Sequence, residues 1–412
     1  MSQAWIIDAC RTPRGIGKQG KGALADLHPQ HLGAAVLKAL KERNDLDTSI
    51  VDDIIFGTSL QSGTQGGDLA RMAALTAGYS TKASGVTLDR YCGSGITAAA
   101  LGASVVASGF EDVIISGGCE MMSTYGANRH APGIGLLDMG NEELRAAYFQ
   151  PHQGVAADAI ASMDGISREA LDQLGYESQQ RAAVAIAEAR FDRSLVPVYS
   201  LAGELLLDHE EYPRPSTTLE RLASLEAAFG GFMDFALDDS GTTMRSAINA
   251  KYPDIDIQPV HHAGTSSGVV DGAAAILFAS DRAVADYGWK PRARVVATAN
   301  VGDDPTLMLN APGPAIRKVL AKAGLTIDDI DTFEINEAFA VVVEKAIRDL
   351  GLDRSKVNPN GGAIALGHPI GATGSILIGT ALDELERIGG RYGLITQCAA
   401  GGMAPAVIIE RV

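Results

Sequence analysis

Aromatic residues are scarce in this sequence, at 5% of 412 residues, whereas glycine occurs 47 times. Large aromatic side chains therefore contribute little to its core. Glycine lets backbones approach closely and adopts conformations that other residues avoid, so its abundance favours tight turns and closely packed helices. Hydrophobic residues make up 46% and charged residues 20% of the chain, as in a soluble globular enzyme.

Cysteine is also rare, with four scattered residues: Cys10, Cys92, Cys119 and Cys398. No CxxC pair and no cluster of metal-ligand residues occurs, so the sequence predicts no structural zinc site and no bound metal. Few, isolated cysteines are typical of a protein in a reducing cytosol.

Basic residues are outnumbered, because 34 Lys and Arg against 50 Asp and Glu give a formal net charge of −16 and a pI of about 4.9. A chain this acidic is not expected to bind nucleic acid or an anionic membrane surface. An anionic small ligand would need a local basic patch.

Long apolar runs are missing as well, and we expect no membrane span, which needs ~20 residues. The first residues, MSQAW, lead straight into a short strand and predict no signal peptide. The last residues, ERV, carry no peroxisomal address. We therefore expect a cytoplasmic protein.

Strands and helices alternate in the same order at both ends of the chain, which predicts an α/β fold with mostly parallel sheets. The first series has a helix, a strand, two helices and a strand, over 32–41, 51–57, 69–77, 96–108 and 112–116. The second has a helix over 315–323, a strand over 330–335, one helix over 339–350 and another that starts at Gly374, and a strand over 392–396. This repetition favours a duplication into two similar halves with a site between them, although a generic α/β rhythm is an alternative.

The middle of the chain has a different texture, with many Gly, Pro and charged residues and short helices such as 177–190. It is typical of a loop domain inserted over the sheet ends, where open α/β folds bind ligands. The length predicts two or three domains. We divide the chain into a first core half (1–118 plus 271–291), a loop domain (119–270) and a second core half (292–412).

Cys92 is the strongest candidate for a reactive residue, in the segment DRYCGSG at 89–95. It follows a predicted strand over 83–88 and precedes a predicted helix. Backbone N–H groups at a helix start would lower the pKa of its thiol and favour the nucleophilic thiolate. A buried cysteine that acts as a small hydrophobe is the alternative.

Three motifs in the C-terminal third supply candidate partners: NEAF at 336–339, GAIALGHPIGATG at 362–374 and CAAGGM at 398–403. A histidine between glycine turns and a cysteine after an apolar strand suit a site built from loop ends. Taken singly, Asn336 could cap a helix, His368 could cap a turn, and Cys398 could fill the core.

With these motifs in this order, the chain resembles the thiolase family, the acyl-CoA acetyltransferases, from the RTP segment at 11–13 to the last strand. The resemblance implies two stacked core halves and a loop domain that holds coenzyme A. It implies thiolysis of 3-ketoacyl-CoA or, in reverse, Claisen condensation of acetyl-CoA. Coenzyme A and acyl-CoA would be substrates, and no permanently bound cofactor is expected.

The resemblance also assigns roles to the reactive residues. Cys92 would hold the acyl group, His368 would accept its proton, and Cys398 would transfer the α-proton of acetyl-CoA. His368 and a water held by Asn336 would stabilise the enolate oxygen. Backbone N–H groups of Cys92 and Ala400 would stabilise the tetrahedral intermediate. The family usually has glycine at the position of Ala400, and alanine tolerates positive φ poorly, so a slower reaction or a reshaped loop is expected.

Four more residues match substrate-binding positions of the family. Ser267 matches a pantetheine contact, and Arg214 matches a neighbour of the adenine nucleotide, although it could equally be a solvated surface arginine. His152 and Gln153 match the acyl pocket, where many thiolases carry methionine in place of Gln153. Thr265 replaces the usual asparagine near Ser267.

Two other functions fit part of the pattern. A condensing enzyme like the ketoacyl synthases shares the duplicated fold and the nucleophilic cysteine, but Cys398 and the NEAF motif argue against it. A non-catalytic acyl-CoA-binding protein could lose Cys92, His368 and Cys398, all of which are present.

The resemblance further implies a homo-oligomer, a dimer of dimers, in which core halves share a sheet edge. The segments Met121-Met122 and Tyr125-Gly126 are candidates for the contact between dimers.

Residues 229–258 form a longer segment than most thiolases have here, and it opens with Phe229, Phe232 and Phe235. Their spacing puts them on one helical face, although the intervening Gly-Gly pair weakens the helix. Either this face packs on the loop domain or another subunit, or it reshapes the acyl pocket for bulky or longer 3-ketoacyl-CoA.

Overall fold

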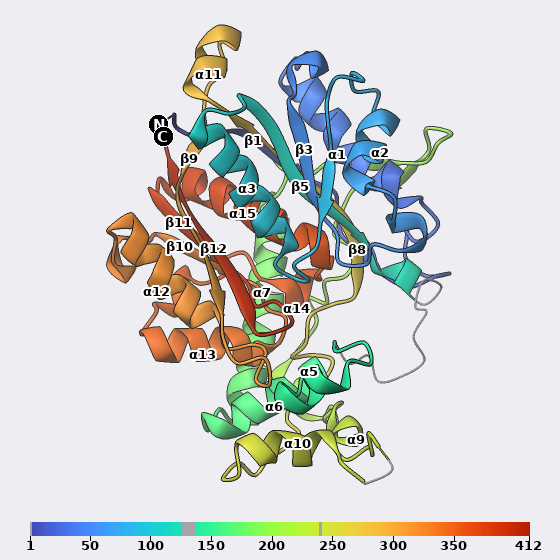
Figure 1. Cartoon of the computed structure of the whole chain (residues 1–412), viewed down its shortest axis with the longest axis vertical. Coiled ribbons are helices and arrows are strands. Elements are labelled where there is room, and N and C mark those ends of the chain that lie inside the picture. Colours follow the sequence, from blue (N-terminus) through green and yellow to red (C-terminus); the bar gives the residue numbers. More distant parts are fainter. Residues whose placement is uncertain (1, 126–136, 239–240) are drawn as a thin grey trace.

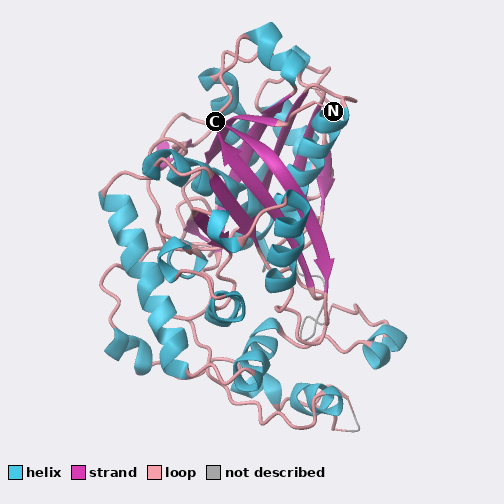
Figure 2. Ribbon diagram, turned by 90° about the vertical axis from the view of Figure 1, so that its left-hand side faces the viewer, coloured by secondary structure: helices cyan, strands magenta, loops and turns pink. Residues whose placement is uncertain are grey.

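The computed structural model describes residues 2–125, 137–238 and 241–412. Two half-sheets alternate with helices to give five layers, in the order helices, half-sheet, helices, half-sheet, helices (Figure 1). Most helices of the loop domain lie beyond one end of these layers, and Figure 2 shows helices below the ends of the strands. Val196, Val198 and Leu207 of the same domain instead pack in the core of the first half.

The first half-sheet has the strand order β4-β3-β5-β8-β1. β3 is parallel to both β4 and β5, whereas β8 is antiparallel to β5 and β1. Helices α1 and α2 cover its outer face. The bounds are β1 (Trp5–Arg11), β2 (Gly15–Ile16), β3 (Asp53–Gly57), β4 (Val86–Leu88), β5 (Val113–Met121), β8 (Val270–Ala279), α1 (Pro29–Arg43), α2 (Leu69–Thr76) and α11 (Asp281–Tyr287).

The second half-sheet has the order β10-β11-β12-β9 and repeats the first. β10 is parallel to β11, and β12 is antiparallel to β11 and β9. Helices α12 and α13 cover its outer face. The bounds are β9 (Ala293–Gly302), β10 (Thr332–Ile335), β11 (Tyr392–Thr396), β12 (Met403–Arg411), α12 (Pro312–Ala323), α13 (Ala340–Leu350) and α14 (Ala363–Leu366).

The two half-sheets join at one corner, where β1 and β9 pair only at Trp5↔Arg294 and Ile6↔Ala293. Between them lie α3 (Ser94–Ser108) and α15 (Ile370–Ile388), whose apolar side chains contact both half-sheets. The window Tyr91–Ser108 is 18 residues long and apolar enough to cross a membrane by length and composition, contrary to expectation. It is 67% buried, which is the position of a core helix.

Matching hydrogen bonds relate the two halves residue by residue. Asp52 Oδ2 accepts a hydrogen bond from the backbone N–H of Val113, and Asp331 Oδ2 accepts one from that of Tyr392, both at 3.0 Å. The aspartate just before β3 therefore joins β3 to its parallel neighbour β5, and the aspartate just before β10 joins β10 to its parallel neighbour β11. These paired contacts and the repeated strand order confirm the duplicated α/β fold. The expectation of mostly parallel sheets is wrong, because only β3 with β4 and β5, and β10 with β11, pair in parallel in the described sheet, whereas its other strand pairs are antiparallel.

The loop domain consists mainly of helices, the longest of which is α7 (Arg168–Ala187). Ser167 caps its N-terminus by accepting the N–H of Ala170, so the helix begins nine residues before the predicted 177–190. The other elements are α5 (Glu142–Ala147), α6 (Gln153–Met163), β6 (Val198–Tyr199), β7 (Leu205–Leu207), α8 (Leu219–Ala223), α9 (Gly230–Met233) and α10 (Met244–Lys251).

Predicted and observed strands differ most around Cys92. The strand expected over 83–88 is only three residues long, because Gly85 lies against the backbone of Arg71 in α2, and a Cβ at Gly85 would be 2.7 Å from the Arg71 nitrogen. In contrast, β5 extends five residues beyond the predicted end because β8 pairs with it as far as Met121.

Candidate active site

Cys92 lies in a tight turn between β4 and α3. The preceding Tyr91 has a left-handed φ of +49°. Its N–H donates to Asp89 Oδ1 at 2.6 Å, and Ser94 Oγ donates to its carbonyl at 2.6 Å. These bonds hold an uncommon conformation for a non-glycine residue and set Cys92 two residues before the first residue of α3.

Glycines bring this turn close to the second half of the protein. A Cβ at Gly95 would lie 2.9 Å from the backbone nitrogen of Gly374, and one at Gly374 would overlap the nitrogen of Ile96. The N-terminal turns of α3 and α15 therefore touch backbone to backbone, as the glycine content led us to expect. His368 stands two residues before α15, just as Cys92 stands two residues before α3.

His368 is buried and contacted on both ring nitrogens. Its Nδ1 lies 2.6 Å from Thr373 Oγ1, and its Nε2 lies 3.4 Å from Asn336 Nδ2. The His368 N–H donates to the carbonyl of Gly268 at 2.9 Å, which ties this loop to the neighbour of Ser267. The structure thus brings His368, Asn336 and the Ser267 loop together.

Cys398 follows β11 and is 1% exposed. Asn336 lies beside this strand end, since its N–H donates to the Thr396 carbonyl at 3.1 Å. Burial and the nearby Cys92 raise the pKa of the Cys398 thiol. The two cysteines, from opposite halves, are therefore close enough for the charge of one to affect the pKa of the other.

The turn after Cys398 corrects the expectation for Ala400. The left-handed φ values of this turn, +80° and +76°, belong to Gly401 and Gly402, and Ala400 has no positive φ. Two hydrogen bonds between Ala399 and Met403, at 2.7 and 3.1 Å, close the turn. Alanine therefore fits at position 400 without backbone strain.

The thiol of Cys92 also differs from expectation. Burial, followed by the charge of Glu120, raises its pKa to about 12, so these effects outweigh the helix N-terminus. Burial lowers the pKa of His368 to about 4. At neutral pH the free protein therefore holds Cys92 as a neutral thiol and His368 as a neutral imidazole.

Glu120 is a site residue that sequence reasoning missed. It is fully buried, and its Oε2 accepts the N–H groups of Ser59 and Gly371, each at 2.8 Å. Its carboxylate thereby anchors the loop after β3 to the start of α15, three residues from His368. The sequence carried one indication of this role, because Glu120 is the single charged residue in the otherwise uncharged strand β5.

Ser267 and Thr265 lie on the loop that leads into β8. The Ser267 N–H donates to the Ala338 carbonyl in the NEAF motif at 3.0 Å. Thr265 is buried, and its Oγ1 accepts the N–H of His262 at 3.0 Å. At the position where the family usually has asparagine, the Thr265 side chain thus forms a hydrogen bond within its own turn, which spans residues 262–265.

Arg214 is exposed, and its guanidinium lies 5.6 Å from the ring centre of Tyr212. Tyr212 packs against Gly268, where an added Cβ would be 2.5 Å from the ring carbon Cζ. A single aromatic ring therefore connects Arg214 to the loop of Ser267.

His152 and Gln153 begin α6, where His152 Nδ1 caps the helix by accepting the N–H of Gly154 at 3.1 Å. The His152 ring stacks on Phe232, with ring centres 4.8 Å apart and an angle of 5°. Phe229 lies 5.5 Å from His152 and 5.7 Å from Phe339 of the NEAF motif. The aromatic group His152, Phe229, Phe232 and Phe339 therefore extends from α6 to the loop of Asn336.

The helical face predicted for Phe229, Phe232 and Phe235 is only partly formed. α9 is one turn long, from Gly230 to Met233, and Phe235 lies beyond it with 57% of its surface exposed. The inward residue of this turn is Met233, which is fully buried.

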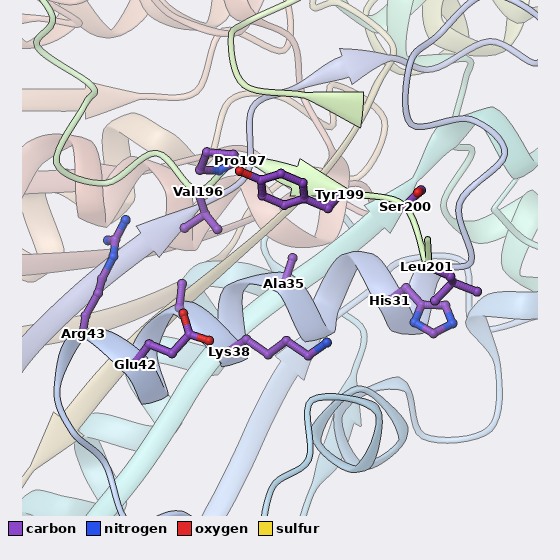
Figure 3. A pocket seen from close by; sticks show the side chains of 11 residues that line it. His31, Ala35, Lys38, Glu42, Arg43, Val196, Pro197, Tyr199, Ser200 and Leu201 are labelled. Atoms are coloured by element: carbon purple, nitrogen blue, oxygen red, sulfur yellow. The ribbon is translucent and has the colours of Figure 1, made fainter. Parts of the chain in front are cut away.

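A separate hollow lies away from these residues, between α1 and β6 (Figure 3). It has a volume of about 440 Å³ and includes His31, Lys38 and Tyr199 in its walls. None of the residues singled out from the sequence lines it. Among the described residues, no three His, Cys, Asp or Glu side chains gather as a metal site.

Comparisons with known proteins agree with this geometry. Residues 4–232 match the N-terminal domain and residues 289–411 the C-terminal domain of thiolase. The chain is 41% identical to a steroid 3-ketoacyl-CoA thiolase of Mycobacterium tuberculosis, over 100% of this chain and 95% of the relative. It is 41% identical to a beta-ketoadipyl-CoA thiolase of Acinetobacter baylyi, over the whole of both chains. It is 38% identical to an acetyl-CoA acetyltransferase of Syntrophomonas wolfei, over 98% of each. The chain therefore belongs to the thiolase family, enzymes that transfer acyl groups between coenzyme A thioesters.

Proposed function

We propose that this thiolase works through an acyl-enzyme on Cys92, with His368 as the base for its thiol and Cys398 as the acid and base for carbon. The supporting observation is that all three side chains are buried and come from both halves of the protein, with Cys92 and His368 just before the starts of the central helices and Cys398 just after β11. A nucleophile, a base and a second proton carrier are what thiolysis requires.

In the thiolysis direction, the Cys92 sulfur attacks the 3-keto carbon as its proton passes to His368. Both groups are neutral beforehand, since burial holds the pKa of His368 near 4 and raises that of Cys92 to about 12. The bond to the α-carbon then breaks, and Cys398 protonates the acetyl-CoA enolate. Free coenzyme A takes the acyl group from Cys92, and the reverse sequence is Claisen condensation.

The oxyanions of these steps need donors. We assign the tetrahedral oxyanion to the backbone N–H groups of Cys92 and Ala400, each donor being worth about 2.7–4 kcal/mol in comparable sites. We assign the enolate oxygen to His368 and to a water held by Asn336. In support, Asn336 Oδ1 is buried without a hydrogen-bond partner in the described part of the chain, as a water-binding atom would be.

Mass measurement tests the acyl-enzyme. After incubation with acetoacetyl-CoA, the acetyl mass should lie on the peptide that contains Cys92, and Cys92→Ala should carry none. The mutant's retention of that mass would sink the assignment. Loss of ketothioester absorbance on adding coenzyme A distinguishes a thiolase from a protein that only binds acyl-CoA.

We further propose that the preferred substrates are 3-ketoacyl-CoA esters larger than acetoacetyl-CoA. The aromatic group around His152 adds contact area beside the acyl pocket, at a segment that is longer than usual. The names of two relatives, which specify steroid and beta-ketoadipyl acyl groups, support the same size class. Gln153 adds a polar group at the start of α6.

Paired variants test this substrate class. Phe232→Ala removes the ring that stacks on His152 and should lower kcat/KM for large substrates more than for acetoacetyl-CoA. Phe235→Ala is the matched control, because Phe235 has no ring contact among the described residues. Equal losses for all substrates, or a wild-type preference for acetoacetyl-CoA, would refute the proposal.

Coenzyme A itself we assign to the face of the loop domain that carries Ser267 and Arg214. Ser267 would contact pantetheine, and the exposed guanidinium of Arg214 would lie beside the adenine nucleotide. Arg214 supplies a positive charge for an anionic ligand at this face. Arg214→Ala should raise KM for coenzyme A severalfold with little change in kcat, and an unchanged KM would count against this assignment.

We propose that the protein assembles as a dimer of dimers in the cytoplasm, and we retain the division at 118/119, 270/271 and 291/292. Among the described strands β4 is the last at its edge of the sheet, and Val86 on it is 44% exposed. An edge strand with exposed apolar groups is suited to pairing with a second copy. For the contact between dimers, Met122 and Tyr125 remain candidates. Met121 does not, because it is fully buried in the core of its own chain, and Gly126 lies outside the described residues. A monomeric mass by light scattering at micromolar concentration would contradict assembly.

A further inference from the structure

Thr373 lies in the first turn of α15, five residues after His368, and only 2% of it is exposed. Its Oγ1 makes two contacts. It is 2.6 Å from His368 Nδ1 and 3.1 Å from the carbonyl oxygen of Pro369. Both contacts are short enough for hydrogen bonds.

The hydroxyl group has one hydrogen, and the Pro369 carbonyl can only accept a hydrogen bond. Asn336 Nδ2 can only donate to His368 Nε2, at 3.4 Å, so in the neutral ring Nε2 carries the lone pair and the ring hydrogen lies on Nδ1. Thr373 Oγ1 accepts the Nδ1–H bond and donates its own hydrogen to Pro369.

We propose that Thr373 is a positioning residue for catalysis, which fixes the tautomer of His368 so that Nε2 keeps the lone pair that takes the proton of Cys92. The proposal rests on the role of His368 as the base. Once Nε2 has taken that proton, the ring is positively charged, and its Nδ1–H bond to Thr373 strengthens because charge-assisted hydrogen bonds are stronger than neutral ones. Thr373 therefore acts in both protonation states.

Without the hydroxyl, Nδ1–H would be buried without an acceptor, and the tautomer with hydrogen on Nε2 would gain population. That tautomer offers Cys92 no lone pair. Losses for partners that orient a metal-ligating histidine are typically about 10- to 100-fold, and we take the same range for a partner that orients a histidine base. We expect a loss of this size in acylation of Cys92, with KM little changed.

The same helix supplies a matched control. Thr380 is also buried, and its Oγ1 donates to the carbonyl four residues earlier, that of Ile376, at 3.0 Å. Thr373 makes the equivalent bond to Pro369. The two threonines thus share helix, burial and local bond, and only Thr373 contacts His368.

The test compares Thr373→Val, Thr373→Ser and Thr380→Val in the full-length enzyme. Acylation would be measured by rapid quench with acetoacetyl-CoA. The tautomer would be read from ¹⁵N magic-angle-spinning spectra of histidine-labelled protein, in the signal that His368→Asn removes. We expect Thr373→Val to acylate about 10- to 100-fold more slowly and to lose the Nδ1–H signal. Thr373→Ser and Thr380→Val should stay within about threefold of wild type.

Wild-type acylation rate and tautomer in Thr373→Val would overturn the proposal. If that variant fails to fold, the wild-type spectrum still decides, because hydrogen on Nε2 in the free enzyme contradicts the assignment. Failure of the proposed function is distinguishable, since it would appear as absence of acyl mass on wild-type Cys92, whatever the spectra show.

Discussion

Replacing Gly374 by alanine should separate the two halves of the active site. A Cβ at this position would overlap the backbone nitrogen of Ile96 and lie 2.7 Å from the carbonyl carbon of Gly95. Backbone atoms of a helix cannot swing aside as a flexible side chain can. α15 must therefore move away from α3, and it carries His368 away from Cys92.

The size of the effect follows from the contact. Ordinary carbon contacts lie near 3.5–4.0 Å. To bring the new Cβ and the Gly95 carbonyl carbon from 2.7 Å to such a distance, the two helices must shift apart by about 1 Å. A displacement of that order in a catalytic group costs about 100-fold in rate. Overpacking of this kind also destabilises a core by about 1–3 kcal/mol. We expect acylation of Cys92 to slow more than substrate binding weakens.

Gly379→Ala is the matched control within the same helix. A Cβ there would meet only the Cβ of Ala9 at 3.5 Å, which is ordinary contact. Alanine also favours the helix by about 1 kcal/mol over glycine. This variant should be fully active and slightly more stable in urea denaturation. If Gly374→Ala acylates as fast as Gly379→Ala, the backbone contact between α3 and α15 does not position the catalytic groups.

Three further predictions concern the titrating groups. Cys398→Ala should still acylate Cys92 and release coenzyme A in a burst, yet fail to condense acetyl-CoA; condensation at near wild-type rate would place the base elsewhere. Alkylation of Cys92 in the free enzyme should keep accelerating with pH above 8, because its pKa is raised to about 12; a plateau near pH 7 would contradict this. His368 takes up a proton in the unfolded chain below its ordinary pKa of 6.5, but in the folded protein only below about 4. The free energy of unfolding should therefore fall by about 3 kcal/mol between pH 6.5 and 4, and a pH titration of His368→Gln should lack that part of the fall.

The sequence was informative where function coincides with the ends of regular elements. Cys92, Asn336 and Cys398 each stand just after a strand, and His368 stands just before a helix, so element order alone indicated that they converge. The duplication was readable for the same reason, since it repeats the order of strands and helices.

Properties that depend on distant atoms could not be read in this way. The pKa of Cys92 depends on complete burial and on Glu120, whose place beside it is a result of sheet pairing. The φ of Ala400 depends on hydrogen bonds between Ala399 and Met403. The contact between Thr373 and His368 exists only because helix α15 starts where it does. Each of these requires three-dimensional packing that no local pattern encodes.

The hydrogen bonds of Asp52 and Asp331 place the two halves in register, and that register has an evolutionary consequence. Counting forward from Val113 and Tyr392, the structural equivalent of Cys398 in the first half is Cys119. The equivalent of His368, two residues before its central helix, is Cys92. Such a chain has the form expected of two fused copies of an ancestral half that once paired with itself. In that ancestor the two copies would have carried identical residues at these positions. After fusion the two copies could diverge, and the two equivalent positions now carry different residues, Cys92 in one half and His368 in the other.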